Sequence, residues 1–112
     1  MSGFSILGRV IVEGTSMQPT YNPRDWLLVY YGFSGKKGLS LRLGDAVVIE
    51  REQQPGIFYI KRIAEIKLDQ SDQQSYFVHS DNESGVDSRT WGYLRSEEIV
   101  AKVVTRIKRN RS

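Results

Sequence analysis

Apolar residues occur along the chain in short runs separated by Gly, Pro, Asn and Asp, as expected for β-strands joined by turns. The segment 99–107 alternates apolar and polar positions, which is typical of a strand with one buried face. Further strands are expected at 9–13, 26–33, 45–51, 57–68 and 76–79. No segment predicts a helix longer than one or two turns. We therefore predict a mainly β protein, built as a small folded antiparallel sheet or barrel.

The longest run, 57–68, is compatible with two kinds of element. A helix would gather four of its aliphatic residues on one face, whereas its aromatic and β-branched residues favour a strand. Because the run directly follows Pro55-Gly56 and its neighbours are β-like, we expect a strand.

The 112 residues suffice for one domain with a modest core, which we place at 1–112 with a basic tail at about 105–112. The chain contains no cysteine and one histidine, His79, which we expect to be structural. These counts exclude a disulfide framework, a thiol nucleophile and a cysteine-ligated or histidine-rich metal site. We therefore expect neither a metal nor a cofactor.

The net charge is +3, and basic residues are concentrated at positions 102–111. Such a tail can bind nucleic acid or anionic lipid, or it can be a solvated terminus. We favour the solvated terminus and expect no nucleic-acid partner, because no basic stripe with interleaved aromatic residues occurs elsewhere. The longest apolar run, 26–31, is too short to span a membrane, so we expect a soluble, cytoplasmic protein without a membrane anchor.

Ser16 is a candidate nucleophile. It follows the expected strand 9–13 and a glycine, and Pro19 forces the chain to turn just after it. A hydroxyl at this position either lies exposed at the rim of a sheet or caps a short helical turn.

Lys61 is a candidate general base. In a strand it shares one face with Tyr59 and Ile63. An apolar setting lowers the pKa of a lysine, and a neutral lysine can accept the proton of a serine hydroxyl. The alternative is a lysine whose amine reaches water while its stem is buried.

Five segments, taken in order, resemble the boxes of the type I signal peptidase family of serine endopeptidases. They are Ser-Met-Gln-Pro-Thr at 16–20, Arg-Asp-Trp-Leu-Leu-Val at 24–29, Gly-Asp-Ala-Val-Val-Ile at 44–49, Tyr-Ile-Lys-Arg-Ile at 59–63, and the stretch from Asp81-Asn82 to Trp91-Gly92. The resemblance extends from about residue 10 to 104. It implies a mainly β fold in which Ser16 is the nucleophile and Lys61 the general base of a Ser/Lys dyad.

The resemblance also implies an oxyanion site near Ser16, whose backbone amide is the expected first donor. Gly14 stands where the best-known bacterial members carry a serine that supplies a second donor, so a backbone amide or water has to replace that side chain. Met17, beside the nucleophile, is a candidate contact for the substrate.

The last box departs from the family pattern at two positions. Gly85 stands where members often have a serine that orients the lysine, and Ser80 replaces a glycine. We expect Ser84 or Ser88 to orient Lys61 instead. Asp87 and Arg89 match the family's structural ion pair; read locally, they are an ordinary surface pair.

Members of this family usually carry an N-terminal membrane anchor and a large second β insertion, and neither is recognisable here. A small soluble branch fits this description, namely the proteases that mature nickel-containing superoxide dismutase by removing a short N-terminal extension. The expected partner is therefore a precursor protein, with the nickel superoxide dismutase precursor as the preferred substrate.

Three alternatives remain open. One is a minimal or anchor-less leader peptidase. Another is a non-catalytic binding module with a basic tail, for which substitution of Ser16 and Lys61 changes nothing. A self-cleaving repressor domain is disfavoured, because no helix-turn-helix precedes residue 10 and no Ala-Gly or Cys-Gly cleavage dipeptide occurs.

Overall fold

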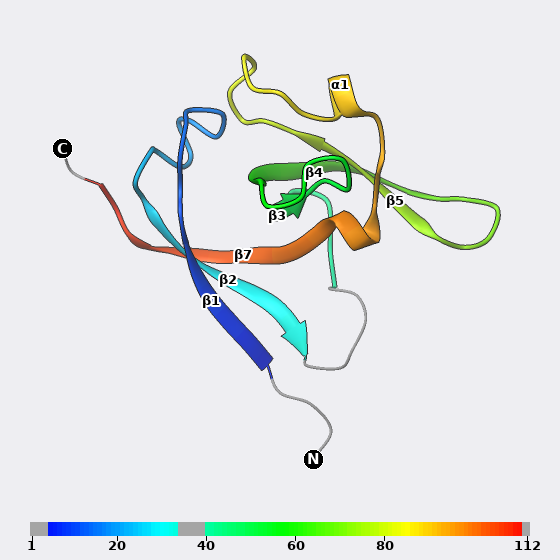
Figure 1. The fold of residues 1–112 in the computed structure, drawn as a ribbon, viewed down its shortest axis with the longest axis horizontal. Coiled ribbons are helices and arrows are strands. Elements are labelled where there is room, and N and C mark those ends of the chain that lie inside the picture. The colour runs from blue at the N-terminus through cyan, green and yellow to red at the C-terminus, as the bar shows by residue number, and fades with distance from the viewer. Residues whose placement is uncertain (1–4, 34–39, 111–112) are drawn as a thin grey trace.

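The computed structural model describes residues 5–33 and 40–110, and part of the connection between the expected strands 26–33 and 45–51 therefore lies outside the described residues. Seven strands and two short helical segments make up the described chain (Figure 1). In order they are β1 (Ser5–Ile11), β2 (Trp26–Phe33), β3 (Ala46–Glu50), β4 (Phe58–Leu68), β5 (Gln74–His79), α1 (Ser88–Trp91), β6 (Leu94–Arg95), the 3-10 turn η1 (Ser96–Glu98) and β7 (Ile99–Lys108). The mainly β prediction is confirmed.

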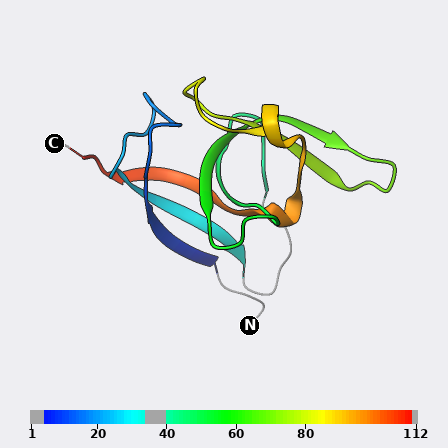
Figure 2. The same cartoon turned by 45° about the horizontal axis from the view of Figure 1, so that its top comes forward.

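All seven strands belong to one antiparallel sheet with the order β1-β2-β7-β3-β4-β5-β6. The sheet curls: β1 and β2 lie on one side of the molecule, and the long β4–β5 hairpin extends to the other (Figure 2). Such curling follows from the twist of neighbouring strands and from register shifts, which occur in four of these pairings.

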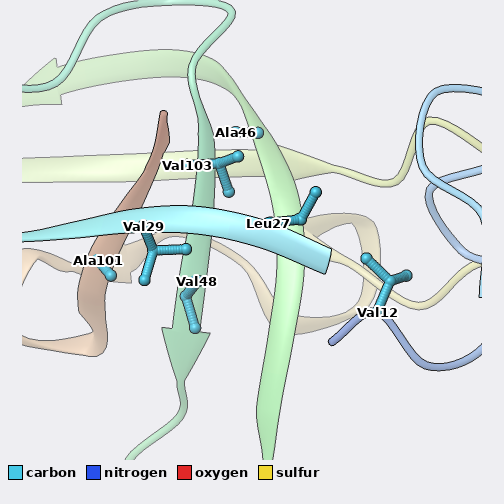
Figure 3. Close-up of a cluster of buried hydrophobic side chains, with 7 residues drawn as sticks. All are labelled: Val12, Leu27, Val29, Ala46, Val48, Ala101 and Val103. Carbon is cyan, nitrogen blue, oxygen red and sulfur yellow. The ribbon is translucent and has the colours of Figure 1, made fainter. Parts of the chain in front are cut away.

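The curled sheet has two apolar clusters, one on each face of β3. Val48 and Ala46 contribute to the first cluster, which lies over β2 and β7 (Figure 3). Val47 and Ile49 contribute to the second, which reaches β4, β5 and β6. Because successive residues of a strand point to opposite faces, a strand buried on both faces reads as an uninterrupted apolar run. Residues 46–49 are such a run.

All six expected strands are present, most of them with shifted boundaries. The ambiguous run 57–68 forms β4, as predicted, whereas β1 ends at Ile11 and begins earlier than expected. The two-residue strand β6 is too short to produce an alternating pattern, and the sequence analysis missed it. Residues 105–108, assigned to the basic tail, form the end of β7 and pair with β2.

Two stretches of strand near the candidate site pair on one side alone within the described residues. β1 is the first strand of the sheet and pairs with β2. The first half of β4, 58–61, pairs with β3, and the pairing of β4 with β5 begins only at Arg62. These two free edges border the candidate site.

Candidate active site

β4 places Lys61 inside the protein. Lys61 lies directly across from Val47 of β3 and shares a face of β4 with Ile63, which belongs to the second apolar cluster. The Lys61 side chain is 2% exposed, and its Nζ lies 5.5 Å and 5.9 Å from the ring centroids of Tyr59 and Trp91. The amine is therefore buried together with its stem, and the alternative in which it reaches water does not hold.

Burial lowers the pKa of Lys61, because removal from water disfavours the ammonium form. The carboxylate of Asp87 opposes this shift and the Arg89 guanidinium adds to it, but burial dominates and the net direction is downward. A larger fraction of neutral amine is consequently present near neutral pH than for an exposed lysine, which is the form that a general base needs.

The Lys61 amine is hydrogen-bonded to the side chain of Ser80. Lys61 Nζ donates a hydrogen bond of 3.0 Å to Ser80 Oγ, and Ser80 Oγ donates in turn to the carbonyl of Val86 at 3.4 Å. The strand register explains the first contact: His79 lies opposite Arg62, so the next residue of the chain emerges beside Lys61. Ser80 is itself buried.

Gly85 packs closely against Ser80 and Ser16. A Cβ atom at this position would collide with the Ser80 hydroxyl and would lie 2.8 Å from the Cβ of Ser16. Ser16 is therefore close to Ser80, the residue that contacts Lys61. A serine at position 85 would have to occupy the volume that the Ser80 side chain fills.

The turn that carries Ser16 is fixed by the loop after β5, and the two loops lie side by side in Figure 2. The Asn82 backbone N–H donates to the Ser16 carbonyl at 2.8 Å, and the Asn82 side-chain amide donates to the Thr15 carbonyl at 3.0 Å. The Asp81 N–H lies 3.4 Å from Met17 Sδ. Three contacts from two consecutive residues of this loop thus hold positions 15, 16 and 17 of the turn in place.

The turn leaves the polar groups of Ser16 available. Among the described residues, neither its hydroxyl nor its backbone N–H has a hydrogen-bond partner, and Ser16 lines an open cleft. Gly14, two residues earlier, has a φ of 76° in the left-handed region that favours glycine. A side chain there would be strained whatever space it found.

Asp87 and Arg89 form the predicted ion pair, with Arg89 Nε 2.9 Å from Asp87 Oδ1. Asp87 also accepts hydrogen bonds from the backbone N–H groups of Ser80 and Arg89 at 2.7 and 3.0 Å. Although burial alone would raise it, these hydrogen bonds hold the pKa of Asp87 at about 2. The pair thereby fixes the backbone of the residue that contacts Lys61.

The two serines expected to orient Lys61 are used elsewhere. Ser84 is exposed and its hydroxyl donates to Asn82 Oδ1 at 3.0 Å, while the buried Ser88 hydroxyl accepts from the Val78 N–H at 2.9 Å. The contact to Lys61 comes from Ser80, which the sequence analysis treated as a replaced glycine. The strand pairing is what could have identified Ser80: His79 of β5 lies opposite Arg62 of β4, so the following residue, Ser80, comes next to Lys61.

The cleft is bounded by the two free strand edges and has a volume of about 660 Å³. Residues 10–13 line one side and residues 56–60 the other. Ser16 and Met17 also line the cleft. Met17, which was predicted to contact substrate, is 1% exposed. A hydroxyl, a neighbouring buried lysine and an adjoining apolar cleft are together equipped for acyl transfer.

Within the described ranges, 5–33 and 40–110, no three His, Asp or Glu side chains come close enough to hold a metal ion. No helix in those ranges is both long and apolar enough to cross a membrane.

The family model of "Signal peptidase, peptidase S26" matches residues 2–70, which is more than half of the chain. The protein belongs to the signal peptidase S26 family. The matched segment includes Ser16 and Lys61, and the family resemblance drawn from the five boxes is confirmed. The loop that supplies Ser80 and Asp87 lies beyond it, so those contacts come from the structure alone.

A relative within the same family is the mitochondrial inner membrane protease subunit 2 of Saccharomyces cerevisiae. It is 29% identical to this chain over 114 aligned positions, covering 84% of the chain. The chain spans 64% of the length of that relative.

Proposed function

We propose that the protein is a serine endopeptidase in which Ser16 attacks the scissile carbonyl and Lys61 is the general base. The observation that carries this proposal is the buried Lys61 amine, 2% exposed and hydrogen-bonded to Ser80. Ser16 lies close to that serine, because a Cβ at position 85 would collide with the Ser80 hydroxyl and would be 2.8 Å from the Ser16 Cβ. An exposed lysine at this position would be charged and unable to accept a proton.

Ser80 is proposed as a positioning residue. Because its own hydroxyl hydrogen is directed at the Val86 carbonyl, Ser80 Oγ accepts a hydrogen bond from an N–H of the Lys61 amine. The lone pair of the neutral amine then stays free to face Ser16. This arrangement orients the amine without stabilising its ammonium form, whereas a carboxylate partner would favour the ammonium and raise the pKa of Lys61.

In the first half of the reaction, neutral Lys61 takes the proton of the Ser16 hydroxyl while Oγ forms a bond to the carbonyl carbon. The carbonyl electron pair moves onto oxygen, and the Ser16 backbone N–H donates to that oxyanion. Collapse of the intermediate breaks the C–N bond, and the Lys61 ammonium donates its proton to the departing amine. An acyl ester on Ser16 and a free amine result.

In the second half, water replaces the departed amine. Lys61 accepts one proton of the water as its oxygen attacks the ester carbon, and returns that proton to Ser16 Oγ as the ester bond breaks. The products are a carboxylic acid, which releases its proton to solvent, and the regenerated hydroxyl, so no co-reactant other than water is consumed.

The substrate is proposed to bind as an extended segment in the cleft. β1 and residues 58–61 of β4 both offer unpaired backbone edges to it. A peptide placed between them can pair with strand edges by main-chain hydrogen bonds, and its side chains then reach the apolar walls.

The proposed substrate is a precursor protein that loses a short N-terminal extension, with the nickel superoxide dismutase precursor as the preferred case. Its support is the resemblance to the small soluble branch of the family, and a cytoplasmic location is part of the same proposal. The second candidate is a leader peptidase acting at a membrane. Similarity to a mitochondrial inner membrane protease subunit favours that candidate.

One experiment separates the two. The purified protein is incubated with an unprocessed nickel superoxide dismutase precursor and with a secretory precursor, and intact mass reports each cut. Ser16→Ala serves as the blank. We expect Ser16-dependent trimming of the dismutase precursor alone. Cleavage of the secretory precursor alone makes the protein a leader peptidase, and cleavage that persists in Ser16→Ala refutes the proposed nucleophile.

A further inference from the structure

The charge of the cleft differs from that of the protein. The chain carries 16 Lys and Arg against 13 Asp and Glu, yet no basic side chain is among the described residues that line the cleft. Glu13 is the one charged residue in that lining, and the rest is dominated by aliphatic and aromatic side chains such as Val10, Ile57 and Phe58.

The Glu13 carboxylate has no compensating partner of its own. Within the described chain it makes no hydrogen bond and no ion pair, and it is exposed to the solvent that fills the cleft. A peptide that enters displaces this solvent and surrounds the carboxylate with apolar walls. Charge interactions strengthen as water is removed, so Glu13 favours an occupant that brings a positive charge.

Glu13 also lies close to the point of reaction. It is three residues before Ser16 and lines the same cleft. Three residues span at most about 10 Å even when the chain is fully extended. A substrate side chain beside Glu13 therefore lies within about three residues of the scissile bond.

We propose that Glu13 is a specificity-determining residue that selects a lysine or arginine within about three residues of the cleaved bond in an otherwise apolar segment. This inference rests on the proposed function for the meaning of the cleft, but the charge preference can be measured as binding alone. The two claims can therefore fail separately.

The binding experiment uses Ser16→Ala, so that no peptide is consumed. The probes are fluorescein-labelled peptides of about ten alanine, valine and serine residues, a length chosen to exceed the cleft. At each position in turn, a peptide carrying lysine is compared with its uncharged counterpart carrying norleucine. We expect the lysine peptide to bind about fivefold more tightly at one position, the size of a good solvent-accessible ion pair.

Substitution of the carboxylate tests its cause. In Ser16→Ala/Glu13→Gln the preference should disappear, and in Ser16→Ala/Glu13→Lys a glutamate at the same peptide position should be preferred. The control Ser16→Ala/Glu97→Gln removes an exposed acid outside the cleft and should retain the preference. High salt should reduce the preference for the lysine peptide, because salt screens the charge interaction. A preference at no position, or one that survives Glu13→Gln, overturns the inference.

Hydrolysis of the same peptides by the wild-type protein tests the proposed function separately. Ser16-dependent cleavage without a lysine preference in binding leaves the peptidase and removes the role of Glu13. A Glu13-dependent preference in binding without any cleavage leaves the cation-selective cleft and removes the proposed chemistry.

Discussion

Lys61 and Arg62 are consecutive residues of β4, and their side chains contact the consecutive residues Ser80 and Asp81. Arg62 meets a carboxylate through two hydrogen bonds of 2.8 and 2.7 Å, at a partly exposed position. Lys61 meets a hydroxyl, at a buried position. Arg62 is thus paired with an opposite charge, whereas Lys61 is hydrogen-bonded to a neutral group.

The difference appears in the acid–base behaviour of the two sites. The hydrogen bond with Asp81 raises the pKa of Arg62 further, and the same bond lowers the pKa of Asp81. Burial lowers the pKa of Lys61 instead. A matched pair stabilises charge and binds two segments together, whereas a buried cation without an adjacent counterion gives up its proton more easily. The first arrangement serves the fold, and the second suits a base.

The largest expected effect is the loss of hydrolysis in Ser16→Ala and in Lys61→Met, by at least about a thousandfold in kcat. Arg62→Met is the matched control on the neighbouring residue. It should unfold more easily, by about 1 kcal/mol, yet retain the activity of its folded fraction. Peptide hydrolysis and urea unfolding of the three variants measure both properties. Equal losses of activity in Lys61→Met and Arg62→Met would remove the distinction between the two sites.

Ser80→Ala should reduce kcat by about ten- to a hundredfold, because the amine loses the acceptor that orients it. A merely structural role would not move the pH dependence of kcat/KM, so that profile is the decisive readout. We expect its midpoint to shift in Ser80→Ala, and Ser84→Ala, which removes an exposed hydroxyl, to leave the profile unchanged.

The double variant Ser80→Gly/Gly85→Ser sharpens the same comparison. Gly85→Ser alone should destabilise the protein, because its new side chain collides with Ser80. In the Ser80→Gly background two of the three closest contacts are gone, and a hydroxyl returns near Lys61. Partial recovery of kcat relative to Ser80→Gly is expected. No recovery in a folded double variant would show that the hydroxyl acts only from position 80.

Asp87 should determine part of the acid stability. Its pKa is about 2 in the folded protein and ordinarily 3.8, so its contribution is complete above the ordinary value and is lost as the pH falls towards 2. The expected loss is about 2 kcal/mol between pH 5 and pH 2. Urea unfolding at several pH values should show a flatter dependence for Asp87→Asn than for the wild type. Asp72→Asn, at an exposed turn, provides the control.

Lys61→Met should be more stable than the wild type at neutral pH, by about 1 kcal/mol, because the buried amine is removed. The wild type should approach the variant as the pH rises. Between the lowered pKa of Lys61 and its ordinary value of 10.5, the unfolded chain binds a proton that the folded chain does not, so stability increases with pH there. A constant difference between the two proteins across this range would contradict the lowered pKa.

Local patterns predicted most of the fold, whereas the family resemblance supplied both members of the proposed dyad. The alternation at 99–107 and the β-branched run at 57–68 were sufficient for two central strands, because strand burial has a short period that a sequence window displays. β6 lacked the length for such a pattern. The role of Ser80 depends on the register between β4 and β5, and register is a property of two segments together.

The cleft was beyond sequence analysis for a similar reason. Its sides come from residues 10–13 and 56–60, which the curled sheet brings to face one another. Glu13 belongs to no sequence motif. It stands out only because it is the one acidic residue among the described residues that line the cleft. Long-range assembly thus decided which serine contacts the lysine and which charge meets the substrate.

The pH dependence of kcat/KM for peptide hydrolysis tests the central claim most directly, with Ser16→Ala as the blank at every pH. If buried Lys61 is the base, kcat/KM rises with pH as the ammonium loses its proton, and levels off at a midpoint well below the ordinary lysine value of 10.5. A Ser16-dependent rate whose rising limb has its midpoint at 10.5, or that does not change with pH, would contradict the account.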